Sequence, residues 1–189
     1  MHLKKIAKII SYLFVPPVLN FLIFIFFSIY FEQQKKWISI FISFALGLVI
    51  PVFTFINFRK KGKIVNDDAT IKEERTIPYI YAILYTLLGL VISSLFNINE
   101  VILKLWLIYL ISSILIININ RFWKISAHAM GAGIPLGASL FINQFWIFLI
   151  ILILVGSSRY ILKVHTTIQI LAGGFLGFIS SFLVLRYCN

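Results

Sequence analysis

The sequence predicts an all-α fold, a polytopic helical membrane protein with six to seven transmembrane helices. Three observations predict this class. Hydrophobic residues make up 61% of the 189-residue chain, against roughly 45–50% apolar residues in soluble domains. Charged residues make up only 12%, and the mean hydropathy is +1.01. The apolar residues also fall into runs close to the length of about 20 residues that a helix needs to cross a bilayer. We therefore expect a single integral membrane domain over residues 1–189.

The apolar runs place the expected helices at 9–31, 37–58, 78–96, 101–119, 126–142, 145–158 and 165–187. The first run is too long for a signal peptide and lacks a small-residue cleavage pattern, so we expect an uncleaved helix. Pro78 can begin the third helix because its missing N–H costs nothing there. The fifth and sixth runs are short, which leaves six or seven crossings open. Several tryptophans lie near expected helix ends, where aromatic residues meet the membrane surface, namely Trp37, Trp106, Trp123 and Trp146.

Residues 59–77 form the one long polar segment, with four of the six acidic and six of the seventeen basic residues. Long polar loops in compact domains tend to be functional. The loop separates an N-terminal helical hairpin (1–58) from a helical core (78–189). Within that core, two helical hairpins each return the chain to the side it left. The loop, the residues around 126–128 and those around 159–165 should therefore share one membrane face.

The net charge of +11 comes from basic residues that lie between apolar runs. That distribution is typical of membrane orientation and attraction to anionic lipid, so we expect no nucleic-acid partner. Thirteen of the seventeen basic residues fall on the face of the 59–77 loop, and the positive-inside rule then directs this face to the cytoplasm. A single cysteine, Cys188, excludes a disulfide framework and a thiol metal site.

Two histidines lie in polar patterns within this apolar sequence. One is in Ser126-Ala127-His128, and the other follows Ser158-Arg159 by five intervening residues, at His165, with Gln169 one helical turn beyond. Polar residues in membrane segments are costly and mark functional sites. The order and spacing of these residues resemble the second and third motifs of the type-2 phosphatidic acid phosphatase superfamily, whose related members include vanadium haloperoxidases.

The resemblance covers about residues 72–177 and implies a role for each matched residue. His165 would be the nucleophile that forms a phosphohistidine, and His128 the general acid for the leaving group. Arg159 and Arg75 would bind the phosphate oxygens in bidentate fashion. Ser126 would add a hydrogen-bond donor at a helix start.

The chain departs from the family pattern in three places. Gln169 replaces the aspartate of the last motif, so it can orient His165 but cannot stabilise an imidazolium by charge. The second motif lacks its proline and glycine. The first motif, Lys-x6-Arg-Pro, is echoed only by Arg75 and the later Pro78, with Lys72 or Lys63 as candidates for its lysine.

The sequence also allows other interpretations of its polar residues. Asn66-Asp67-Asp68 begins like the magnesium box of membrane prenyltransferases, but the next acid position is Thr70 and no second acidic box follows. We therefore expect neither a metal nor a cofactor. The two histidines could instead join helices through hydrogen bonds, and Gly173, Gly174 and Gly177 predict close helix packing.

The resemblance to the phosphatase superfamily implies a metal-independent phosphatase that hydrolyses a phospholipid or isoprenoid phosphate. Candidate substrates are phosphatidate, phosphatidylglycerol phosphate, a polyprenyl diphosphate and a phosphorylated glycolipid. The resemblance also suggests the bacterial cytoplasmic (inner) membrane, where bacterial members of the family often face outward. The alternative is a catalytically silent relative that binds lipid phosphate or acts as an assembly partner. A small-solute transporter is disfavoured because paired broken helices are lacking.

Overall fold

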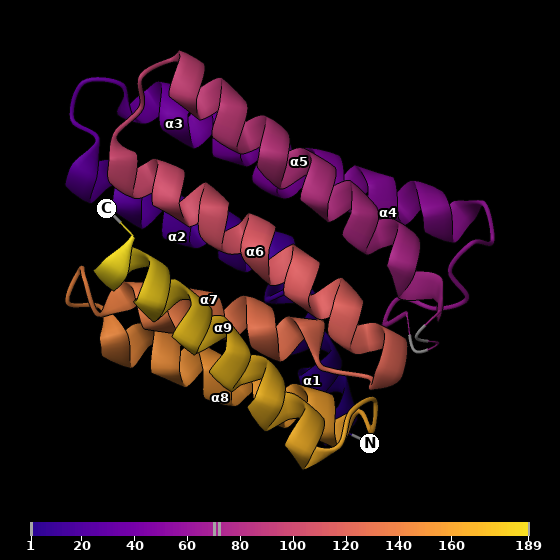
Figure 1. Cartoon of the computed structure of the whole chain (residues 1–189). Coiled ribbons are helices and arrows are strands. Elements are labelled where there is room, and N and C mark those ends of the chain that lie inside the picture. The colour runs from indigo at the N-terminus through magenta and orange to yellow at the C-terminus, as the bar shows by residue number, and fades with distance from the viewer. Residues whose placement is uncertain (1, 70, 72, 189) are drawn as a thin grey trace.

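The computed structural model describes residues 2–69, 71 and 73–188, which form helices and their connections without any strand. Figure 1 shows long helices packed side by side. In chain order the elements are α1 (His2–Leu13), α2 (Pro16–Phe31), α3 (Lys36–Ile42), the π-helix η1 (Ser43–Val49), α4 (Ile50–Lys60), the 3-10 turn η2 (Glu73–Arg75), α5 (Thr76–Leu95), α6 (Glu100–Phe122), α7 (Ala127–Ser139), α8 (Phe145–Ile161) and α9 (Thr167–Tyr187).

The prediction of an all-α protein with membrane-spanning helices is confirmed. Four continuous helical stretches of the described chain are long and apolar enough to cross a membrane: Lys36–Lys60, Glu73–Leu95, Glu100–Phe122 and Thr167–Tyr187. The bent pair α1 and α2 makes five if it counts as one span. The other two expected spans are shorter helices, α7 with 13 residues and α8 with 17. Length and composition therefore account for four or five of the six to seven crossings that the sequence predicts.

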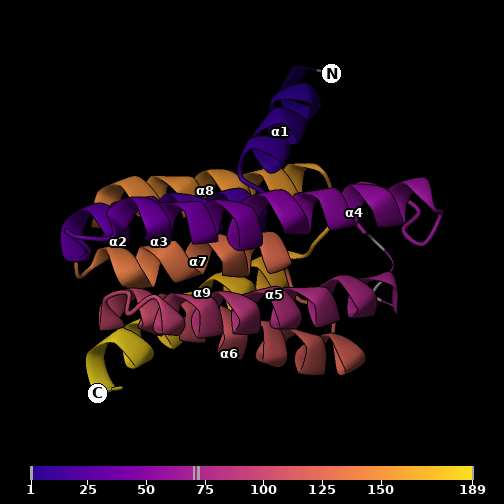
Figure 2. The same cartoon turned by 90° about the horizontal axis from the view of Figure 1, so that it is seen from above.

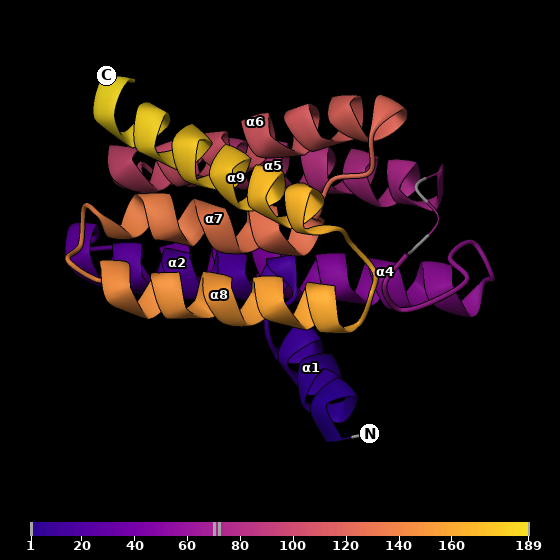
Figure 3. The same cartoon turned by 90° about the horizontal axis from the view of Figure 1, so that it is seen from below.

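The expected helix over residues 9–31 is divided in the structure into α1 and α2. The chain bends by 53° between α1 and α2, because Val15 is extended (φ −64°, ψ 151°) and Pro16 begins α2. A residue before proline is disfavoured in the α conformation, whereas proline is well tolerated in the first turn of a helix. Figures 2 and 3 show α1 projecting from the side of the bundle.

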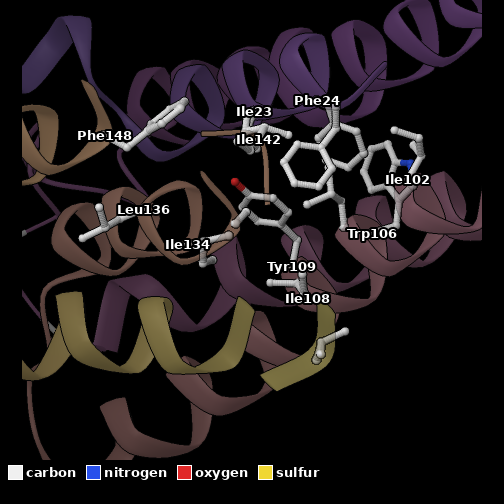
Figure 4. Close-up of a cluster of buried hydrophobic side chains, with 14 of the residues drawn as sticks. Ile23, Phe24, Ile102, Trp106, Ile108, Tyr109, Ile134, Leu136, Ile142 and Phe148 are labelled. Atoms are coloured by element: carbon white, nitrogen blue, oxygen red, sulfur yellow. The ribbon is translucent and has the colours of Figure 1, made fainter. Parts of the chain in front are cut away.

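Large side chains from α2, α6, α7 and α8 fill much of the core shown in Figure 4. Phe24 of α2 packs on Trp106 of α6 with ring centroids 4.5 Å apart. Gly89 of α5 makes room for Trp106, since a Cβ there would lie 2.5 Å from its ring. Trp106 is fully buried, so its expected place at the membrane surface is wrong. In a bilayer such contacts stabilise mainly through close packing, because lipid tails are as apolar as the core.

Helix α7 lies at the centre of the C-terminal half, in contact with α2, α8 and α9. Glycines on both helices allow α7 and α9 to meet backbone to backbone. At Gly173, a Cβ would lie 2.5 Å from the carbonyl oxygen of Ser126. The packing role predicted for the glycines of α9 is thus visible in the structure, and it sets the spacing between the start of α7 and the start of α9.

Three connections meet at the same end of the bundle, together with α1 (Figure 1). They are the loop between α4 and α5, the segment between α6 and α7, and the turn between α8 and α9. The first is somewhat shorter than predicted, because α4 continues to Lys60 and α5 begins at Thr76. Contacts across these connections, given below, show that the three polar segments lie close together.

Candidate active site

Arg159 is the most deeply buried charged residue of the candidate site. It occupies the last turn of α8 and has no exposed surface. Its Nη1 donates to Oδ1 of Asp68 at 2.6 Å and to Oγ of Ser11 at 2.5 Å. Its Nε is buried and has no hydrogen-bond partner within the described chain. A buried guanidinium requires charge compensation and acceptors, and one of its donors still lacks an acceptor.

Arg75 lies 5% exposed at the end of the α4–α5 loop. Its guanidinium donates to backbone carbonyls, from Nε to Ala69 at 2.6 Å, from Nη1 to Ile125 at 3.2 Å and from Nη2 to Asp68 at 3.5 Å. These bonds pin the loop to the segment that leads into α7. Most of the hydrogen-bond donors of Arg75 therefore hold the loop, while its positive charge acts on the nearby His165.

His165 precedes α9 and is held by Gln169. Its Nδ1 lies 3.1 Å from Oε1 of Gln169, and the same oxygen accepts from the backbone N–H of Thr166 at 3.1 Å. Because the Thr166 bond identifies that amide atom as an acceptor, Nδ1 of His165 must carry the hydrogen of the neutral ring. The other nitrogen, Nε2, then has a free lone pair. Thr166 and Gln169 form a capping box at the start of α9, which explains why Gln169 points back to His165.

The surroundings of His165 keep the ring neutral. Burial first, and the charge of Arg75 next, lower the pKa of His165 to about 3, with smaller contributions from Arg159 and Lys124. Both causes disfavour the protonated ring. At neutral pH the imidazole is therefore unprotonated, with the charges of Arg75, Arg159 and Lys124 nearby.

His128 and Ser126 come from the start of α7. Ser126 is fully buried and is the N-cap, with its Oγ accepting from the N–H of Ala129 at 3.3 Å. Its N–H donates to the carbonyl of Gln169 at 3.2 Å, which ties the starts of α7 and α9 together. His128 lies near Arg159, His165 and the backbone of Ser11. The two histidines of the sequence motifs therefore lie in one cluster.

Lys124 is a site residue that sequence reasoning counted only toward membrane orientation. Its Nζ donates to the carbonyl of Val164 at 3.0 Å. Burial, followed by the charges of Arg75 and Arg159, lowers the pKa of Lys124. It lines an open cavity of about 680 Å³ together with His165 and Gln169. In the sequence, the only indication that Lys124 belongs to the site is its position two residues before Ser126.

Asp68 and Ser11 are the other two residues that the sequence did not assign to the site. Asp68 is one of the four acidic residues of the polar loop, and it pairs with Arg159 at 2.6 Å. Nothing in the sequence pointed to Ser11, because it lies 148 positions from Arg159, the residue that it contacts.

Other predicted residues lie apart from this cluster or outside the described chain. Ser158 donates to the carbonyl of Val155 within its own helix. Lys63 lies over the ring of Phe58 at 5.5 Å. Lys72 is outside the described residues. Among those that are described, no group of three or more His, Cys, Asp or Glu side chains is placed to hold a metal ion.

The chain was compared with protein-family models, curated proteins and solved structures, and no match was found in any of the three.

Proposed function

We propose that this chain is a lipid phosphate phosphatase that acts through a phosphohistidine at His165 without a metal. One observation carries the proposal. A neutral histidine, with Nδ1–H held by Gln169, lies next to three cations at one end of an apolar helical bundle. Phosphoryl transfer needs a positioned nucleophile and fixed positive charge around the equatorial oxygens, and this cluster offers both.

In the proposed reaction, Nε2 of His165 attacks phosphorus and the bond to the ester oxygen breaks. His128 gives a proton to the departing alkoxide, and the arriving phosphate favours the protonated form of His128 by adding negative charge nearby. Water then attacks the phosphohistidine while His128 takes one of its protons. Inorganic phosphate leaves, and Nε2 of His165 again has its free lone pair.

The cations have separate parts in this proposal. Arg159 offers its unpaired Nε, and a phosphate oxygen competes with Asp68 for Nη1. Lys124 reaches the cavity beside His165 with an ammonium that has three donors, of which the bond to Val164 uses one. Arg75 contributes mainly charge, since its donors hold the loop.

The proposed substrate is a phospholipid or isoprenoid phosphate whose tail remains in the bilayer. In this arrangement α7 and α8 complete six to seven crossings, because α7 is enclosed by α2, α8 and α9 and need not match the bilayer thickness itself. We infer that the site lies at the cytoplasmic face of a bacterial inner membrane, following the excess of basic residues on that side.

The test is phosphate release from phosphatidate, phosphatidylglycerol phosphate and a polyprenyl diphosphate by detergent-purified protein in EDTA. His165→Ala should abolish release. His128→Ala should slow it by about 10²-fold or more and accumulate acid-labile phosphohistidine. His2→Ala, which changes the remaining histidine, is the matched control and should be unaffected. Release that persists in His165→Ala would refute the mechanism.

A second function is favoured by the Asp68–Arg159 ion pair, which already occupies one donor of the anion site. A silent relative would bind lipid phosphate without turnover. In that case no lipid would release phosphate, yet the folded protein would bind orthophosphate, and His165→Ala would largely retain that binding.

A further inference from the structure

Helix α1 has an apolar flank and a basic flank, and both are exposed. The large apolar residues Leu3, Ile6, Ile9 and Leu13 are 53–69% exposed. Lys4, Lys5 and Lys8 are exposed as well, and helical periodicity puts them on a different side of the helix from the apolar residues. A helix in water would not leave four large apolar side chains uncovered, and a spanning helix would not carry three lysines in two turns.

The inner edge of α1 is a narrow strip that packs on the bundle. Ala7 and Ser11 are 2% and 4% exposed, one helical turn apart, and α1 contacts α8. Figures 2 and 3 both show α1 leaving the bundle sideways and not continuing along α2. Three sides of the helix are thus distinct, one toward the protein, one apolar and one basic.

This combination is the pattern of a helix in the membrane–water boundary. Such helices bury their apolar flank at the edge of the acyl chains, while lysines reach the headgroups. Lysines near an anionic leaflet also gain from its negative surface potential. The attachment of α1 to α2, an apolar helix of the bundle, keeps it beside the bilayer.

The inner edge of α1 also completes the candidate site. Ser11 accepts from Nη1 of Arg159 at 2.5 Å, and its backbone meets His128. Tyr12 donates to Oδ2 of Asp67 at 2.8 Å, next to the residue that pairs with Arg159. The placement of α1 therefore bears on the position of the site residues.

We propose that α1 is an interfacial helix that binds the surface of an anionic lipid leaflet and thereby holds Ser11 against Arg159 and His128. Its apolar flank lies among the upper acyl chains, and its three lysines lie among the lipid phosphates. The candidate site is then held at headgroup depth by contact with the leaflet itself.

The test uses the single cysteine of the chain. In a Cys188→Ser background, Ile9→Cys and Lys4→Cys, which lie on different sides of α1, each receive an environment-sensitive fluorophore, and the full chain is reconstituted in vesicles of phosphatidylcholine with or without phosphatidylglycerol. Brominated acyl chains should quench the label at position 9, and aqueous iodide the label at position 4. Equal quenching of both positions by iodide, or of both by brominated lipid, would overturn the proposal.

The lysines provide a second test that does not depend on catalysis. Phosphatidylglycerol should shift the emission of the position 9 label to the blue, and Lys4→Gln/Lys5→Gln/Lys8→Gln should weaken this response, by roughly fivefold in lipid preference per lysine. The control Lys60→Gln/Lys61→Gln/Lys63→Gln removes the same charge from exposed residues where α4 ends and the following loop begins, at the same end of the bundle. An equal loss in both triple variants would refute specific binding through α1.

Discussion

Replacement of Asp68 by asparagine tests the central ion pair of the candidate site. The asparagine side chain retains an acceptor for Nη1 of Arg159 and nearly the same shape, so the change removes charge and little else. Arg159 is fully buried, and its other partner at Nη1, Ser11, is neutral. The variant therefore leaves a guanidinium in the bundle without its compensating carboxylate.

The expected cost follows from burial. Breaking a buried pair by removing one partner costs about 3–5 kcal/mol. The side chain of Asp68 is 32% exposed, and the amide keeps the hydrogen bond, so we expect about 2 kcal/mol. For a chain of this size, that corresponds to a fall of about 4–8 °C in the unfolding temperature.

The assay is thermal unfolding in detergent, with and without orthophosphate. Phosphate should stabilise the Asp68→Asn protein more than the wild type, because the anion no longer competes with a carboxylate for Arg159. Asp67→Asn is the matched control, since Asp67 pairs with Arg59 at 3.2 Å on the exposed side of the loop and should cost about 1 kcal/mol or less. Equal phosphate responses in wild type and both variants would refute the assignment of Arg159 as an anion site.

Four further outcomes are expected. Gln169→Glu keeps the length of the side chain and places a carboxylate beside Nδ1 of His165, so it should raise the pKa of that ring and increase phosphate release by up to about 10²-fold; unchanged or lower release would contradict the proposed orienting role. The pKa of His165 is lowered to about 3 in the folded chain, so between about pH 6.5 and 3 the unfolded chain binds a proton that the folded chain does not bind. The free energy of unfolding should therefore decrease as pH falls through this range. His165→Asn should remove that dependence in pH-dependent denaturation. Lys124→Gln should weaken orthophosphate binding, measured by calorimetry, whereas Lys163→Gln, from the exposed rim of the same cavity, should change it little. Gly173→Leu should unfold the protein or abolish phosphate release, because a Cβ at that position already lies 2.5 Å from the carbonyl that begins α7, and a wild-type melting curve would contradict the role of this contact.

The sequence was sufficient to predict that the helices are apolar and that the polar segments gather at one end of the bundle. Hydropathy located the apolar helices, because a bilayer requires long apolar segments with internally satisfied backbones. The break before Pro16 could also have been predicted, since two prolines in succession disfavour a continuous helix at that point. The proximity of His165 and Gln169 is local, because His165 comes directly before the N-cap Thr166 and the Gln169 side chain returns to that N-cap in the capping box.

Contacts that join distant segments could not be predicted in the same way. The polar loop carries four acidic residues, and only the packed structure shows that Asp68 is the one against Arg159. It suggested Arg75 as a phosphate ligand, whereas the structure directs its donors to backbone carbonyls. Both outcomes depend on how the α4–α5 loop packs against Arg159 and against the segment that leads into α7.

By itself, then, the sequence determined an all-helical membrane protein and the order in which its polar segments return to one end of the bundle. Only the tertiary structure decided that Asp68, Ser11 and Lys124 join the two histidines. The physical reason is that apolar periodicity specifies which segments are helical and how long they are, but not their rotation or separation. Those depend on side-chain volume at the contacts, such as the close approach of Gly173 to Ser126, and a shift of a few ångströms decides which donor meets which acceptor.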